Sequence, residues 1–411
     1  MAYIPPHLRV SDGKSRPRPE PPPPSRREPN SFARGNEKGL VPDVRINYSG
    51  DFISRFIVMS QEPLEFERFH GETFAHLDHK ELYVLKTRDA KEDDNSTDQE
   101  NVEKKVKESP SDLIAKTSGE DLKQVLEKFK SFIVMENADR IVPRVAIKFG
   151  KVIFHCRGGS LERSGGFLRN AIEAKDGRLR DLSKTFDNSV SEEKYSLLYN
   201  IAFRNAEKTW SRERYTVQVS DETNPGKQLL CVCMGAKSNE QLQHCSISSS
   251  GSCLKMIKVK FATVRYFICD MACVKKTSDI RLMLCTKNYC TGLNEEELED
   301  LESCFSNVSL IPNVKGGLHW PAGSKQSRSG RFKVLGSTHS EKVVFVGRGL
   351  RWSLQKRNRI EFKASSGRVS YEVNIRPTSY DKFCQGPEDM SIEDLLSLIL
   401  EVIDQAWEQF V

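Results

Sequence analysis

The stretch from Asp279 to Val373 constrains the fold of this chain most. It begins with DIRLMLCTK and ends with EFKASSGRVSYEV, two segments in which apolar and polar residues alternate. Such period-two alternation is typical of β-strands that bury one face. Two glycine-containing turns, Gly316-Gly317 and Ser366-Gly367, interrupt the stretch. It therefore predicts a set of antiparallel strands with short connections.

Further periodic segments on either side extend this pattern to an α+β fold. Apolar residues at helical spacing predict helices over 122–133, 192–203, 294–305 and 392–410, the last packing across the sheet. Alternating runs predict strands at 52–59, 81–86, 215–219, 228–234, 254–261, 264–273 and 280–285. The run 145–156 predicts a hairpin that turns at Gly150-Lys151. We expect a curved, mainly antiparallel sheet with flanking helices.

Two segments lack the apolar residues that folding requires. Residues 1–43 form a tail rich in proline and arginine, with an uninterrupted proline run from Pro21 to Pro24. Such a segment favours an extended, solvated conformation. Residues from about 88 to 112 mix both signs of charge and predict a disordered loop. The remainder, 44–411, predicts a single α+β domain.

Composition and cysteine usage predict a soluble intracellular protein. No window approaches the roughly 18 apolar residues of a membrane helix, and the N-terminus has no apolar signal region. The 11 cysteines are an odd number, which argues against a disulfide framework. We expect a cytoplasmic and/or nuclear location and no membrane partner.

Positive charge is concentrated between Val314 and Arg376. This stretch carries fourteen lysines and arginines against three acids, a balance of +11, whereas the whole chain has a net charge of +6. Interleaved aromatic residues would stack on bases while the cations hold phosphates. The residues predicted to bind nucleic acid are Arg348, Arg351, Trp352, Lys356, Arg357 and Arg359. The alternative is a solvated sheet face whose aromatic residues belong to the core and whose charge the acidic helix at 295–302 offsets.

The sequence contains no catalytic signature. The glycine-rich segment 158–166 fits neither phosphate-loop pattern, and the spacing of Cys269 and Cys273 satisfies only half of a zinc motif. His76 and His79 form a weak candidate for metal or acid–base chemistry. We therefore predict no catalytic residue, no metal and no cofactor, and expect the cysteines to pack in the core.

Three functional hypotheses remain open. The first is a non-enzymatic protein associated with RNA or translation, and the second is an enzyme acting on a nucleotide or phosphorylated substrate. The third is a scaffold for protein interactions. The direction of the basic side chains separates the first two: convergence with acids such as Glu361 or Glu372 inside a concave pocket favours an enzyme. An open convex basic face favours RNA binding.

The first residues suggest a docking peptide. The segment YIPPHLR, from Tyr3 to Arg9, resembles a motif in the N-terminal heads of DEAD-box helicases, where it is associated with a cap-binding translation initiation factor. In this chain Tyr3 and Leu8 would be the anchors on either side of a stiff diproline spacer. No helicase core follows, so the resemblance implies a translation-factor or other protein partner and no enzyme.

The chain as a whole resembles a family of plant proteins that carry a domain of unknown function. The resemblance rests on MAYIPPH at the start, RLMLCTK at 281–287, VKGGLHWP at 314–321 and EFKASSGRVSYEV at 361–373. The usual opening of that family is MAYIPPHKRH, from which Leu8 departs. The resemblance implies neither an activity nor any catalytic residues.

Overall fold

A computed structural model gives the fold of the chain. The residues that it describes are 45–49, 52–59, 66–69, 82–85, 109–135, 140–155, 183–235, 254–261, 263–273, 276–290, 292–305, 308–320, 331–362 and 366–410. By its internal contacts the chain divides into residues 1–40 and 41–411, and all described residues belong to the second unit.

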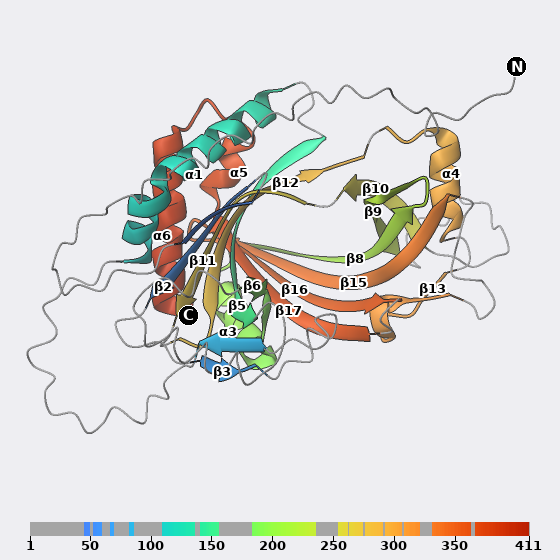
Figure 1. Ribbon diagram of the computed structural model, residues 1–411, viewed down its shortest axis with the longest axis horizontal. Coiled ribbons are helices and arrows are strands. Elements are labelled where there is room, and N and C mark those ends of the chain that lie inside the picture. Colours follow the sequence, from blue (N-terminus) through green and yellow to red (C-terminus); the bar gives the residue numbers. More distant parts are fainter. Residues whose placement is uncertain are drawn as a thin grey trace, which may run out of the picture. The chain divides into compact units, whose positions relative to one another are not determined.

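The elements of this unit confirm an α+β protein dominated by one large sheet (Figure 1). The helices are α1 (Pro110–Val134), α3 (Glu192–Arg204), α4 (Glu295–Ser303), α5 (Ser379–Phe383) and α6 (Ile392–Phe410), with a 3-10 turn η5 (Lys315–Gly317). The strands of the first half are β1 (Arg45–Ser49), β2 (Phe52–Met59), β3 (Phe66–Arg68), β4 (Leu82–Leu85), β5 (Ile141–His155), β6 (Ser183–Asp187), β7 (Ser189–Val190), β8 (Lys208–Asp221) and β9 (Asn224–Gly235). Those of the second half are β10 (Leu254–Phe261), β11 (Val264–Cys273), β12 (Asp279–Asn288), β13 (Ser309–Leu310), β14 (Leu318–His319), β15 (Phe332–Gly347), β16 (Leu350–Glu361) and β17 (Ser366–Pro377).

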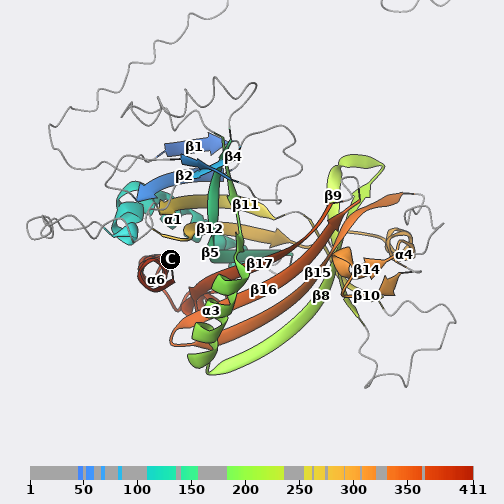
Figure 2. The ribbon, with the colours of Figure 1, turned by 90° about the horizontal axis from the view of Figure 1, so that it is seen from below.

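The large sheet curls back on itself. Its main path runs β1-β2-β11-β12-β5-β17-β16-β15-β8-β9-β10, and every pairing along it is antiparallel except that of β2 with β11. Figure 2 shows how strongly β8, β15, β16 and β17 bend. Lys260 in β10, at one end of this path, forms a bridge with Tyr289, the residue after β12, and the Cys290 N–H donates to the Val259 carbonyl at 2.9 Å. The eight strands from β12 to β10 therefore surround a common interior.

The alternation of side chains along these strands separates an inner face from an outer face. Paired residues on neighbouring antiparallel strands project to the same side. One such row crosses five strands and carries Lys148, Asn374, Ser353, Val344 and Trp210 on the inner face. Residues one position away project to the outer face, where Ile147 in β5 and Ile375 in β17 are buried.

Two apolar cores cover the outer face. In the first, α1, α3, α5 and α6 pack on β5, β12, β16 and β17, with Phe129, Ile147 and Leu395 fully buried. In the second, α4 packs on β8, β9, β10 and β15 around Leu301 and Phe332. The apolar stripe of α6 lies within the first core, as its spacing predicts. Packing of this outer face is the main apolar stabilisation of the sheet.

Contacts at the helix ends fix α1 against α6. Ser109 caps α1 by accepting a hydrogen bond from the Asp112 N–H, and Asp112 accepts one from the Ser109 N–H in return. Asp404 of α6 accepts from the Ser111 N–H at 3.0 Å and from the Ser111 hydroxyl. The helix therefore begins at Pro110, so residues 109–112, the last of the predicted disordered loop, form an ordered helix terminus. No described helix has the length and apolar character needed to cross a membrane.

The predicted hairpin at 145–156 is wrong. The segment belongs to one continuous strand, β5, whose first part pairs with β12 and whose last part pairs with β6. Gly150 is needed for a close approach between backbones: a Cβ atom at this position would lie 1.9 Å from the Asp187 carbonyl oxygen. Glycine inside a strand often marks a close approach of another backbone.

We expect Gly150→Ala to lower the free energy of unfolding by about 2 kcal/mol or more, because the added methyl group has to displace the Asp187 backbone. Gly119→Ala is the matched control, since Gly119 lies inside α1 with nothing within 4 Å of its added Cβ. That variant should gain about 1 kcal/mol from higher helix propensity. Urea unfolding of the three proteins measures both effects, and equal shifts for the two variants would contradict the assignment.

Candidate anion-binding site

Positively charged side chains from five strands meet on the inner face of the curved sheet. Six of them are called the inner cation cluster below. Arg144 is central, because its charge acts on four of the others. The members are Arg144 and Lys148 from β5, Arg214 from β8, Lys260 from β10, Lys287 from β12 and Lys342 from β15.

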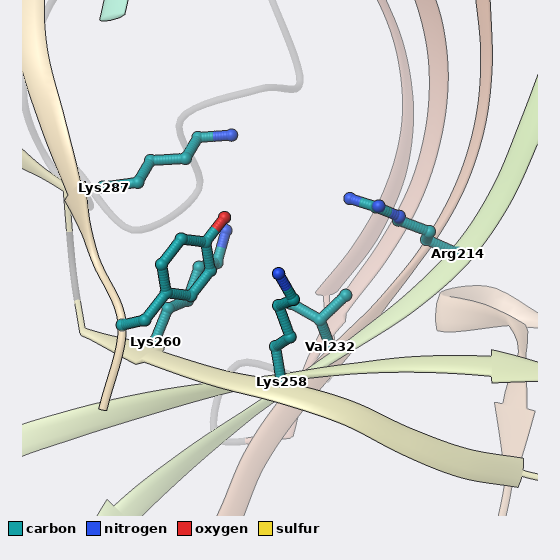
Figure 3. A pocket seen from close by; sticks show the side chains of 6 residues that line it. Arg214, Val232, Lys258, Lys260 and Lys287 are labelled. Atoms are coloured by element: carbon teal, nitrogen blue, oxygen red, sulfur yellow. The ribbon is translucent and has the colours of Figure 1, made fainter. Parts of the chain in front are cut away.

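Part of the cluster lines a pocket at the place where the sheet closes. The pocket is bounded by Arg214, Val232, Lys258, Lys260, Lys287 and Tyr289, which come from β8, β9, β10, β12 and the residue after β12. Figure 3 shows the amines of Lys258, Lys260 and Lys287 and the guanidinium of Arg214 directed into the same space. Strands distant in the sheet order therefore bring their cations together only because the sheet curls.

The members of the cluster lack direct ion-pair partners among the described residues. None of its six members forms an ion pair with a described carboxylate. The Nε atoms of Arg144 and Arg214 are also buried without a hydrogen-bond partner. Buried donors are nearly always satisfied in folded proteins, by protein atoms or by ordered water. The positive surroundings of these two N–H groups favour an anionic acceptor.

Burial and mutual repulsion weaken the proton affinity of the cluster lysines. Burial, followed by the charge of Arg144, lowers the pKa of Lys287 to about 6. The same two causes lower the pKa of Lys342 to about 7. Burial also lowers the pKa of Lys148 and of Lys260. Part of the cluster is therefore uncharged at neutral pH, and an anion that restored its protons would be bound more strongly.

One acid lies beside the cluster. Glu372 in β17 is 8% exposed and accepts a hydrogen bond from Arg357 at 2.9 Å, and its charge raises the pKa of Lys148 against the effect of burial. Within the described part of the chain, no three histidine, cysteine, aspartate or glutamate side chains are placed to hold a metal ion. Cys231, Cys233, Cys269 and Cys285 are buried free thiols. The site is thus dominated by cations.

Three of the predicted nucleic-acid-binding residues lie on the inner face but are already paired with acids. Arg351 donates to Asp381 at 2.9 Å, and Arg357 donates to Glu372. Arg359 forms an ion pair with Glu361. Each of these three arginines therefore has a carboxylate partner, in contrast to the members of the inner cation cluster, none of which forms an ion pair with a described carboxylate.

The other three predicted residues lie elsewhere. Trp352 is only 3% exposed and belongs to the first core on the outer face, so a base cannot stack on its ring. Lys356 is exposed on the outer face, with its amine 5.9 Å from the centre of the Tyr371 ring. Arg348 occupies the turn between β15 and β16 with a positive φ of 48°. Because side chains alternate between the two faces of the sheet along β16, Trp352 and Lys356 lie on the opposite face from the neighbouring arginines.

Sequence reasoning restricted to residues 314–376 missed most of the cluster. Only Lys342 belongs to that stretch. The signal for the others is a cation at every second or fourth position of a strand whose alternate residues are apolar, as in Arg144-Val145-Ala146-Ile147-Lys148. The predicted docking residues Tyr3 and Leu8 lie outside the described residues.

We expect the free energy of unfolding to rise between pH 6 and pH 9. Lys342 has a pKa of about 7 in the folded chain against about 10.4 when unfolded, so the unfolded chain holds more protons between these values. Each such lysine adds at most about 1.4 kcal/mol per pH unit to the slope of the free energy of unfolding against pH. Lys342→Met should raise stability at pH 8 and flatten the slope.

Urea unfolding at pH 6, 7, 8 and 9 measures this slope. Lys356→Met, which removes an exposed lysine from the outer face, is the control and should leave the slope unchanged. If Lys342→Met destabilised the protein equally at every pH, the lysine would be structural and the proposed repulsion absent.

Comparison with solved structures finds distant likenesses. The Pct1 RNA triphosphatase of S. pombe matches with 10% sequence identity and a TM-score of 0.36, covering 70% of this chain and 91% of that one. The same enzyme in complex with the Spt5 CTD matches with 12% identity and a TM-score of 0.36 over 70% and 92%. A putative adenylate cyclase from Bacillus halodurans matches with 11% identity and a TM-score of 0.23 over 54% and 88%. At TM-scores this low the likenesses carry no argument about function.

Comparison by sequence is more decisive. No curated protein matches the chain. One family matches residues 42–410, which is nearly the whole length and includes every element of the curved sheet. The chain therefore belongs to the family defined by the domain of unknown function DUF7903.

Proposed function

We propose that this domain binds the phosphate groups of a nucleotide or another phosphorylated ligand inside its curved sheet. The observation that carries the proposal is the inner cation cluster, six basic side chains from five strands that form no ion pair with a described carboxylate. Like charges brought together away from water repel one another strongly. A ligand with several negative charges relieves this repulsion and supplies acceptors to the orphaned guanidinium donors.

The enclosure of the cluster favours a compact anion over an extended RNA strand. Phosphate contacts to a strand of RNA are usually made from an accessible groove or open surface. Here the cations point inward from strands that close around them at Lys260 and Tyr289. A short phosphate chain, or the phosphorylated end of a larger molecule, fits such a site better. RNA association through a phosphorylated end stays compatible with this arrangement.

The convergence of cations with Glu372 agrees with the hypothesis of a nucleotide or phosphorylated substrate. Recognition of phosphate is common to binding and to catalysis, and the cations account for recognition. Glu372 lies beside the cluster, and its carboxylate already accepts a hydrogen bond from Arg357 at 2.9 Å. Binding is therefore the function that the geometry supports best, and phosphate release from a bound nucleotide is the assay that would reveal catalysis.

Inorganic tripolyphosphate should bind to the domain and raise its melting temperature. Arg144→Met should weaken binding at least about tenfold, since a charge-assisted hydrogen bond contributes roughly 1.5–3 kcal/mol. Titration calorimetry in EDTA measures the affinity without bound divalent cations. Arg144 is the position of choice because its charge acts on four other members of the cluster.

The matched control is again Lys356→Met, which removes the same unit of charge from the outer face. It should leave tripolyphosphate affinity within about twofold, apart from the general effect of net charge. Equal losses in the two variants would show a nonspecific electrostatic attraction and overturn the proposal. Binding that Arg144→Met leaves intact would place the phosphate site elsewhere.

Binding should be accompanied by proton uptake near pH 7. An anion next to Lys287 and Lys342 raises their pKa values from about 6 and about 7, so both amines gain protons on binding. Affinity should therefore fall as the pH rises from 6.5 to 8.5. Calorimetry at pH 7.5 in two buffers of different ionisation enthalpy counts the protons directly.

Tripolyphosphate itself also gains or loses protons when it binds. The double variant Lys287→Met, Lys342→Met measures this contribution of the ligand. It should bind with less proton uptake than the original chain at the same pH. If both proteins took up the same number of protons, the two lysines would not be in contact with the bound anion.

A further inference from the structure

An exposed tryptophan lies on the inner face beside the inner cation cluster. Trp210 in β8 is 37% exposed. It is paired with Val344 in β15, and Lys342 lies two residues from Val344 on the same face. The indole is therefore a neighbour of the cluster and shares its side of the sheet.

The other tryptophans of the chain have evident structural roles. Trp352 is buried in the first core. Trp320 donates its indole N–H to the Cys304 carbonyl at 3.3 Å and meets the Phe362 ring edge-on at 5.2 Å. Trp407 packs against the first core from α6. Of the four, Trp210 alone combines large exposure with a position on the inner face.

The ring of Trp210 is held in place from one side. The guanidinium of Arg351 lies 4.9 Å from the ring centre. Arg351 is itself fixed by Asp381 at 2.9 Å, and Asp381 also pairs with Arg376. A tryptophan packed on one face by an anchored arginine is a prepared surface on which a second flat group stacks at little entropic cost.

We infer that Trp210 and Arg351 form a base-binding subsite, so that the ligand is a nucleotide whose phosphates lie in the inner cation cluster. This inference rests on the proposed function. Stacking requires an aromatic ring on the ligand, which a nucleobase has and which inorganic phosphate chains and phosphorylated sugars lack. Asp381 is shared between Arg351 and Arg376, so it holds Arg351 in place beside the indole, where Arg351 contributes a flat, positively charged surface.

Titration calorimetry with ATP and with inorganic tripolyphosphate, both in EDTA, separates the base from the phosphates. The chain should bind ATP more tightly than tripolyphosphate. Trp210→Leu should weaken ATP binding roughly 5- to 100-fold, in line with one stacked base, and leave tripolyphosphate binding within about twofold. Trp210→Phe, which keeps an aromatic surface, should retain most of the ATP affinity.

Intrinsic fluorescence gives a second readout, because ATP should quench Trp210 and the quenching should vanish in Trp210→Phe. If tripolyphosphate binds but Trp210→Leu weakens neither ligand, or both equally, the base-binding subsite is overturned and the phosphate site stands. If neither ligand binds the original chain, the proposed function and this inference both fall. Melting curves of Trp210→Leu without ligand verify that the variant is folded.

Discussion

The repulsion among cations inside the curved sheet is the interaction on which the rest of the structure depends. Arg144 and the other members of the cluster form no ion pair with a described carboxylate, and the lowered pKa of Lys287 shows how unfavourable its charged form is. Such a cluster costs stability in the absence of a ligand. The apolar packing of α1, α3, α5 and α6 on the outer face has to offset this cost. The same strands thus have stabilising apolar side chains on the outer face and the cations of the cluster on the inner face.

This division between faces explains which parts of the fold the sequence predicts. The strands at 52–59, 254–261 and 264–273 and the helix at 392–410 have the bounds expected from periodicity. β5 differs because its first part pairs with β12 and its last part pairs with β6, and Gly150 lies where the backbone of Asp187 comes close. Local pattern contains no information about such long-range approaches, which is why a turn was expected at Gly150.

The site was less predictable than the fold, for two physical reasons. A cation at alternate positions of a strand has the same pattern whether its face meets solvent or an enclosed interior, so Lys148 and Lys260 look like ordinary surface residues. Closure of the sheet also brings together residues far apart in sequence, such as Arg144 and Lys342. Counting charge in one stretch therefore found Arg351, Arg357 and Arg359, whose charges are paired within the protein.

The paired and unpaired cations have different consequences for a ligand. Arginines held by Asp381 or Glu372 are fixed in place and add shape to the inner face. Arg144 and Arg214 keep a permanent charge, since a guanidinium stays protonated in proteins. Lys287 and Lys342, with pKa values of about 6 and about 7, adjust their charge to whatever is bound. A site that combines permanent and adjustable cations accommodates phosphate groups of differing ionisation. When a more highly charged phosphate binds, a lysine beside it takes up a proton from solvent.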